Sequence, residues 1–176
     1  MRLFDYIQQG GPIMYILLTL NIVGFALLIW KALTVVDAKK HFHETVEDLK
    51  NRIKGLVNFD DSDVALNLLK DEVQITVHRL ESGLNTIKII AGIAPLLGLL
   101  GTVLGILSAF HVISDSGLSN PSLFAGGIAM ALLTTVGGLI VAIPHFVGYN
   151  YLTGALDDYE ILLEKQLVKE IYGKKE

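Results

Sequence analysis

The chain has 176 residues, of which 52% are hydrophobic and only 18% are charged, and its mean hydropathy is +0.53. This composition is typical of a membrane protein and not of a soluble domain. The formal net charge of −4 gives no support to nucleic-acid binding, and the absence of cysteine excludes disulfides and thiolate chemistry. The five histidines are dispersed along the chain, so we expect neither a metal site nor a cofactor.

Three long runs without charged residues predict an all-α fold with three membrane-spanning helices. They cover residues 13–30, 89–110 and roughly 123–151. A helix needs about 20 apolar residues to cross the hydrocarbon core, so each run is long enough, the first with little to spare. A cleaved signal peptide is the competing interpretation of the first run. It is disfavoured because Asp5 follows Arg2 and because the apolar stretch is too long.

The distribution of Lys and Arg predicts the orientation. One basic residue precedes the first span, nine lie between Lys31 and Lys88, none lies between the second and third spans, and four follow the third. Because loops rich in Lys and Arg stay in the cytoplasm, we expect a bacterial inner-membrane protein with a periplasmic N-terminus and a cytoplasmic C-terminus. The expected organisation is a periplasmic segment (1–12), spans at 13–31, 89–112 and 122–151, a cytoplasmic helical loop (32–88), a periplasmic turn (113–121) and a cytoplasmic C-terminal helix (152–176).

The segments outside the spans also carry helical patterns. Leu3, Phe4 and Ile7 suit a short amphipathic helix on the periplasmic surface of the membrane. Apolar residues spaced by four and three predict a helix over residues 42–56. A similar series over residues 66–87 runs straight into the second span, which predicts one helix of about 45 residues.

The helix of the third span is predicted to continue beyond the membrane, and a short polar turn is predicted to join it to the second span. The apolar positions that continue its helix are Leu156, Tyr159, Leu163, Leu167 and Ile171. We therefore expect a cytoplasmic bundle of the two long helices, with the 42–56 helix as a third partner. The polar residues 114–121 predict a tight turn, with Asn120 as N-cap and Pro121 at the first helical position.

Small residues recur every three or four positions in both helices of this hairpin. They are Ala91, Ala94, Gly98, Gly101, Gly105 and Ala109 in the second span, and Gly127, Ala131, Thr134, Gly138 and Ala142 in the third. Such faces allow helix backbones to approach closely in a membrane. Packing within one chain is one interpretation. Assembly of several copies is equally supported, because two such faces are more than one hairpin is expected to bury.

The polar side chains within the hairpin predict an ion path. They are Thr102, Thr134, Thr135 and His145, and at about 100° per residue Thr135 and His145 lie within a quarter-turn of Gly138 and Ala142. The alternative is that each threonine hydroxyl bonds a carbonyl of its own helix. Pro144 is expected to kink the helix just before His145, whose imidazole is either a proton relay or a satisfied polar group.

Charged residues are missing from all three apolar runs, residues 13–30, 89–110 and 123–151. A single subunit of this kind cannot carry a proton on an intramembrane carboxylate. If the assembly moves ions, the titrating acid must come from another chain.

Two motifs of the hairpin identify a family. Residues 93–105, IAPLLGLLGTVLG, and residues 127–144, GIAMALLTTVGGLIVAIP, closely resemble the ExbB/TolQ/MotA proton-channel family. Three spans with the N-terminus outside are most similar to the ExbB and TolQ branch. The choice between Ton-type and Tol-type systems stays open.

The resemblance implies an inner-membrane homopentamer around a dimer of single-span ExbD/TolR-like partners, each supplying an essential Asp. Ion flow would drive a TonB/TolA-like protein. The family's functional threonines fall on Thr102 and Thr135. Many ExbB and TolQ members carry Glu where this chain has Met130, so that proton acceptor is missing, and sodium coupling stays open beside the favoured protons.

Three other functions compete with this hypothesis. A non-conducting membrane scaffold, whose glycines only pack helices, is the main alternative. A substrate transporter is disfavoured because the chain has no inverted repeat and no charged mid-membrane site. An enzyme is not expected, since no nucleophile, base and acid can be combined from the available polar residues.

Overall fold

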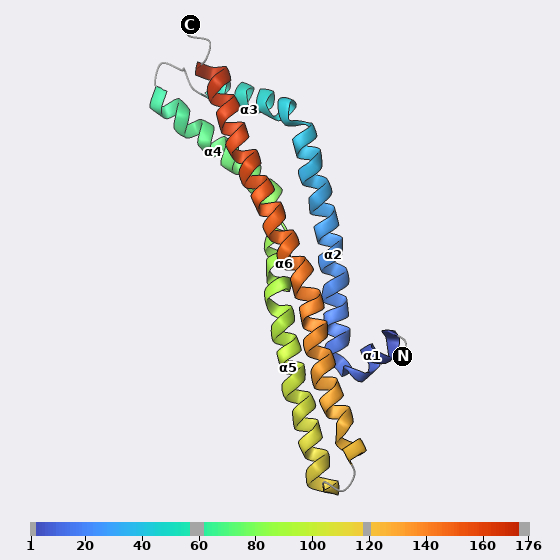
Figure 1. The fold of residues 1–176 in the computed structure, drawn as a ribbon. Helices are drawn as coiled ribbons and strands as arrows, with labels where there is room; N and C mark the ends of the chain where they lie inside the picture. The colour runs from blue at the N-terminus through green and yellow to red at the C-terminus, as the bar shows by residue number, and fades with distance from the viewer. Residues whose placement is uncertain (1–2, 57–61, 118–120, 173–176) are drawn as a thin grey trace. The chain divides into compact units, whose positions relative to one another are not determined.

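A computed structural model of the chain describes residues 3–56, 62–117 and 121–172 (Figure 1). Its elements are α1 (Leu3–Gln9), α2 (Gly11–Lys40), α3 (Phe42–Leu56), α4 (Ser62–Glu81), α5 (Leu84–Ser116) and α6 (Pro121–Tyr172). No strand occurs within these ranges, and the predicted all-α fold is confirmed.

Three of the helices are long and apolar enough to cross a membrane. These are α2, α5 and the part of α6 between Phe124 and Ile171. The prediction of three spans is therefore confirmed, although each helix continues beyond the apolar run that predicted it. The limits of the spans and their orientation stay predictions.

The chain forms two compact units, which we describe separately. The membrane unit consists of Met1–Leu28 and Thr86–Tyr149, and the polar unit, which holds nearly all the charged residues, consists of Ile29–Asn85 and Asn150–Glu176. Both α2 and α6 contribute residues to each unit without a break in the helix.

In the membrane unit, α2 and α6 run in the same direction. Along both helices the residue numbers of the contacting pairs increase in parallel. Leu17 lies beside Gly137, Gly24 beside His145, and Leu28 beside Gly148. A buried apolar cluster fills the contact between these two helices and α5. Its members are Ile13, Leu17, Ile90, Ala94, Val141 and Ala142.

In the polar unit, large apolar side chains from three helices form the core. Its fully buried members include Leu49 and Ile53 of α3, Leu69 and Val73 of α4, and Leu156, Tyr159, Leu163 and Leu167 of α6. The rings of Phe42 and Tyr159 meet edge to face, with centroids 5.8 Å apart. The predicted 42–56 helix and the apolar series at the C-terminal end of α6 are thus confirmed.

The predicted continuous helix through residues 66–87 into the second span is wrong. The structure ends α4 at Glu81 and begins α5 at Leu84. Between them Gly83 has a φ of +91°, in the left-handed region where glycine commonly ends a helix. The apolar spacing holds on both sides of the break, which is why periodicity alone did not reveal it.

A lysine from α2 stabilises this break. Lys31 is only 3% exposed, and its Nζ donates a hydrogen bond to the carbonyl of Leu80 at 3.1 Å. A carbonyl in the last turn of a helix lacks an intrahelical partner, and a cation there also suits the helix dipole. Lys31 therefore caps α4 from a neighbouring helix.

The turn between α5 and α6 begins later than expected. Residues 114–116, predicted in the polar turn, belong to α5, because Gly117 caps that helix in the left-handed conformation and donates to the Ile113 carbonyl at 2.8 Å. Pro121 begins α6 as predicted, while Asn120 lies outside the described residues. The short helix α1 forms where it was expected, and its place at the periplasmic surface stays a prediction.

Candidate functional site

The small residues of α5 and α6 face each other inside one chain. A Cβ added to Gly105 would lie 2.6 Å from the carbonyl oxygen of Gly127 and 2.7 Å from the amide nitrogen of Ala131. A Cβ added to Gly138 would lie 2.6 Å from the carbonyl oxygen of Ala94. No side chain fits between backbones this close, so these positions require glycine.

This arrangement corrects one expectation. Two small-residue faces do not exceed what one hairpin can bury, because the face of α5 packs directly on that of α6. The predicted packing residues that the structure places in this buried contact are Ala94, Gly98, Gly101, Gly105, Ala109, Gly138 and Ala142. Pro144 is half-buried within α6, which continues through it as a helix. Any contact between copies must therefore use other surfaces.

Thr134 belongs to the same buried contact. Its side chain is 0% exposed and occupies the space that a Cβ on Gly101 would need. Its hydroxyl bonds carbonyls of its own helix, those of Met130 at 2.9 Å and Ala131 at 3.0 Å. The structure thus places Thr134 in the packing of the hairpin.

Thr102 and Thr135 are only half-buried. The hydroxyl of Thr102 donates to the Leu99 carbonyl at 2.5 Å, and that of Thr135 to the Ala131 carbonyl at 3.3 Å. Both threonines thus bond carbonyls of their own helices, as the alternative to an ion path predicts. Each hydroxyl oxygen still has free lone pairs. Both side chains can therefore accept a hydrogen bond from a group outside the chain or coordinate a cation.

His145 lies in the interior of the membrane unit. It is 0% exposed, its Nδ1 lies 2.6 Å from the Val141 carbonyl, and its ring contacts Phe25 with centroids 5.0 Å apart. The ring rests directly against Gly24, where any side chain would collide with it. The predicted polar face of α6 is thus divided, with Gly138, Ala142 and His145 inside the chain and Thr135 at its edge.

Three residues of α2 escaped the sequence analysis. Asn21 and Gly24 face the contact with α6, and Lys31 caps α4. Asn21 is the one amide within residues 13–30 and Gly24 the one glycine, which are signals that we could have used. No group of three potential metal-ligating residues occurs in the described part of the chain.

Met130 stands where the resemblance to the ExbB and TolQ branch leads us to expect a glutamate. It packs toward Gly11, where an added Cβ would lie 3.1 Å from the Met130 methyl carbon. This contact is apolar, and it lies at the start of α2. A thioether does not titrate, so Met130 cannot serve as a proton acceptor.

Comparison with known proteins now identifies the chain's relatives. The model of the MotA/TolQ/ExbB proton channel family matches residues 39–165. The biopolymer transport protein ExbB of Aquifex aeolicus is 51% identical over 63 residues, which are 36% of this chain and 43% of that protein. The biopolymer transport protein exbB1 of Vibrio cholerae is 42% identical over 77 residues, which are 43% of this chain and 34% of that protein.

A third relative agrees with these two. The biopolymer transport protein ExbB of Neisseria gonorrhoeae is 37% identical over 84 residues, which are 48% of this chain and 38% of that protein. The chain thus spans less than half the length of each of these curated relatives. With its three apolar helices it is a multi-pass membrane protein, and it belongs to the MotA/TolQ/ExbB proton channel family.

Proposed function

We propose that the chain is an ExbB-like subunit that converts an ion-motive force into work in the bacterial inner membrane. In this proposal several copies, expected to be five, surround single-span ExbD/TolR-like partners, expected to be two. The N-terminus is periplasmic and the C-terminus cytoplasmic. The assembly drives a TonB/TolA-like protein, with protons as the favoured coupling ion.

The observation that carries this proposal is the position of Thr102 and Thr135. They are half-buried on the two helices that bear the family motifs, and the described spans hold no charged side chain between Lys88 and Asp115 or from Phe124 to Tyr151. A hydroxyl can stabilise a passing ion but cannot carry a proton by titration. The partner's Asp would supply the titrating group and the threonines would line its path.

The proposal keeps Thr134 and His145 outside the path. Both are fully buried inside a single chain, so a path between copies would not reach them without a rearrangement of the hairpin. We therefore expect Thr102 and Thr135 to be sensitive to loss of the hydroxyl during ion flow, and Thr134 to affect mainly the packing of the hairpin.

Proton flux in proteoliposomes tests this function. The chain is reconstituted with a single-span partner from the same genome, and the flux is compared for wild type and Thr135→Val. Valine has the shape of threonine without the hydroxyl, so assembly is expected to persist while the flux falls at least tenfold. Thr19→Val is the matched control, because Thr19 of α2 is exposed and likewise bonds a carbonyl of its own helix at 2.9 Å.

A non-conducting scaffold is the second candidate, and one observation favours it. Thr102, Thr134 and Thr135 all bond carbonyls of their own helices, as threonines without a functional role do. The scaffold predicts equal behaviour of Thr135→Val and Thr19→Val, and no flux above that of empty vesicles. That result would contradict the transducer hypothesis and support the scaffold hypothesis.

A further inference from the structure

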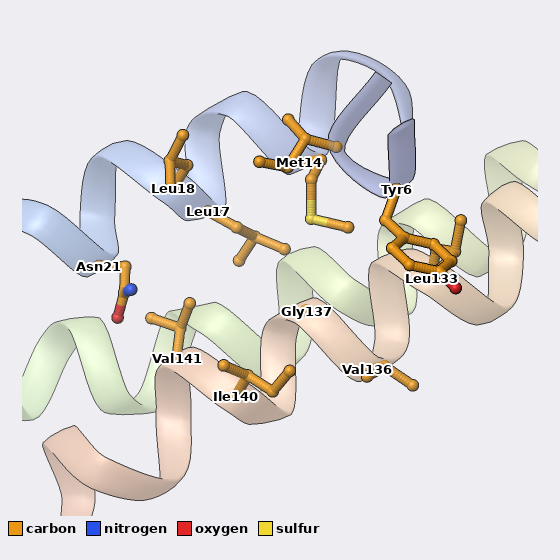
Figure 2. Close-up of a pocket in the computed structure, with 11 residues that line it drawn as sticks. Tyr6, Met14, Leu17, Leu18, Asn21, Leu133, Val136, Gly137, Ile140 and Val141 are labelled. Carbon is orange, nitrogen blue, oxygen red and sulfur yellow. The ribbon is translucent and has the colours of Figure 1, made fainter. Parts of the chain in front are cut away.

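An open groove lies on the surface of the membrane unit, where α1, α2 and α6 meet. Its volume is about 400 Å³, and Figure 2 shows Tyr6 and Leu133 at one end and Asn21 and Val141 at the other. The lining residues from α2 and α6 all fall within the first and third apolar runs. At this depth the medium around the chain is hydrocarbon, from which water is absent.

The groove has a buried floor and exposed apolar rims. Leu17 and Val141 of the floor are 0% and 4% exposed, whereas Leu18 and Ile140 of the rims are 40% and 62% exposed. Gly137 also lines the groove and brings no side chain into it. An apolar ligand could therefore lie between the rims and cover the floor.

The groove is too narrow to seat a helix. From Leu133 to Val141 it follows α6 for about 12 Å, at a rise of about 1.5 Å per residue. A volume of about 400 Å³ over this length gives a cross-section of about 33 Å². A helix with its side chains is about 10 Å wide and needs more than twice that area. A single extended hydrocarbon chain is slim enough to lie along the groove.

The chemistry of the walls also favours a flexible chain over a second helix. Where α5 and α6 meet closely, the contact is made by glycine and alanine. Apart from Gly137, the groove is lined by larger side chains, and among its described lining residues only Tyr6 and Asn21 are polar. Tyr6 lies at the end formed by α1. Its apolar ring and polar hydroxyl suit the boundary between acyl chains and lipid head groups.

We propose that this groove binds one acyl chain of a membrane phospholipid, with the head group at the Tyr6 end. The bound chain covers the floor and fills the space between α1 and the two longer helices, so that Tyr6 and Ile7 pack against it. The short helix α1 is joined to α2 through Gly11, whose φ is +67°, and the lipid holds it in place. This inference does not depend on the proposed ion flow, because a chain that conducts no ions can bind the lipid.

Native mass spectrometry of the full chain in detergent, with added dioleoylphosphatidylethanolamine, tests the site. Ile140→Trp and Val136→Trp each place an indole ring at the groove and should lower the amount of bound phospholipid at least threefold. Two substitutions are used so that the test survives if one of them prevents folding. Ile143→Trp is the matched control, because Ile143 is as exposed as Ile140 (61% against 62%) but lies outside the lining, and it should bind lipid as the wild type does.

The occupant is checked by labelling at the rim. The chain has no cysteine, so Leu18→Cys introduces a single thiol, which should react with an apolar maleimide after lipid is removed and be protected when lipid is added back.

Three results would overturn the site. The absence of bound phospholipid in the wild type would mean that the groove holds no lipid. Equal binding by Ile140→Trp, Val136→Trp and Ile143→Trp would mean that the lipid lies elsewhere on the chain. Protection of the Leu18→Cys thiol that persists without lipid would assign the groove to a second copy of the chain.

Discussion

The two units of the chain achieve close packing by opposite means. In the membrane unit, α5 and α6 meet through glycine and alanine, and backbone atoms of one helix touch the other. In the polar unit, α3, α4 and α6 meet through leucine, isoleucine, valine and tyrosine. Burial of large apolar side chains stabilises helices in water, but it gains little where lipid already surrounds them, so the membrane unit relies on close approach.

The comparison predicts that removing side-chain volume damages the polar unit most. Leu163 is 0% exposed, and Leu163→Ala should lower the free energy of unfolding by about 2–5 kcal/mol, because the lost contacts leave a cavity. Ile161, two residues earlier on the same helix, is 63% exposed, and Ile161→Ala is the control. Denaturant titration of the purified chain measures both. Equal losses would mean that the burial of Leu163 does not stabilise this unit.

Adding volume should damage the membrane unit. In Gly105→Ala the new methyl would meet backbone atoms of Gly127 and Ala131, which cannot turn away as a side chain could. We expect a loss of about 1–3 kcal/mol from overpacking. Gly92→Ala, on the same helix with nothing within 4 Å, should be neutral or stabilising. Thermal unfolding in detergent distinguishes the two, and a tolerated Gly105→Ala would contradict the tight hairpin.

The polar contact at the end of α4 is expected to have a smaller effect. Lys31→Met keeps most of the apolar stem but removes the bond to the Leu80 carbonyl. The cost should be about 1 kcal/mol, since relief of a buried charge offsets part of the lost hydrogen bond. Amide hydrogen exchange should accelerate in the last turn of α4 and not in α3. Lys39→Met, at an exposed position of α2, is the control.

The smallest effect concerns a carboxyl group of the polar unit. Burial, together with the charges of Glu164, Glu81 and Asp157, raises the pKa of Glu160. A carboxyl whose pKa is raised by folding stabilises the fold when protonated and loses that contribution as the pH rises through the folded pKa. Glu160→Gln should therefore be more stable at neutral pH by about 0.2–0.5 kcal/mol.

The pH dependence checks the origin of that gain. The advantage of Glu160→Gln should fade as the pH falls through the raised pKa, because the wild-type carboxyl then becomes neutral as well. Thermal unfolding across a series of buffers measures the difference. Glu47→Gln, on an exposed position of α3, should show no comparable gain. An advantage that persists in acid would assign the effect to packing and not to charge.

Local patterns sufficed to predict most helices. Apolar runs located α2, α5 and α6, and three- and four-residue spacing predicted α3 over residues 42–56. The break at Gly83 was missed because the apolar spacing continues across it. A single glycine inside a helical pattern is often tolerated, and only its φ and the distant Lys31 show that the helix ends here.

The candidate site was less predictable, because burial depends on which face of a helix meets its neighbour. Thr134 and Thr135 are adjacent in sequence, yet one fills the space beside Gly101 and the other is half-buried at the edge of the hairpin. Thr135 and His145 point to similar sides of α6, as their spacing predicted. Their environments differ, because His145 is fully buried and Thr135 is half-buried. The contacts of Asn21, Gly24 and Lys31 join residues far apart in sequence, and no local pattern reports them.

The interruption at Ser82 and Gly83 affects how motion passes along the chain. A twist about a helix axis travels only as far as the ladder of backbone hydrogen bonds continues, and α2 and α6 extend that ladder through both units. Between α4 and α5 the ladder is interrupted at Gly83, where the chain takes a left-handed conformation. A twist of α5 about its own axis therefore does not pass to α4 through a continuous ladder of backbone hydrogen bonds, so the helix that carries Thr102 is not mechanically continuous with α4.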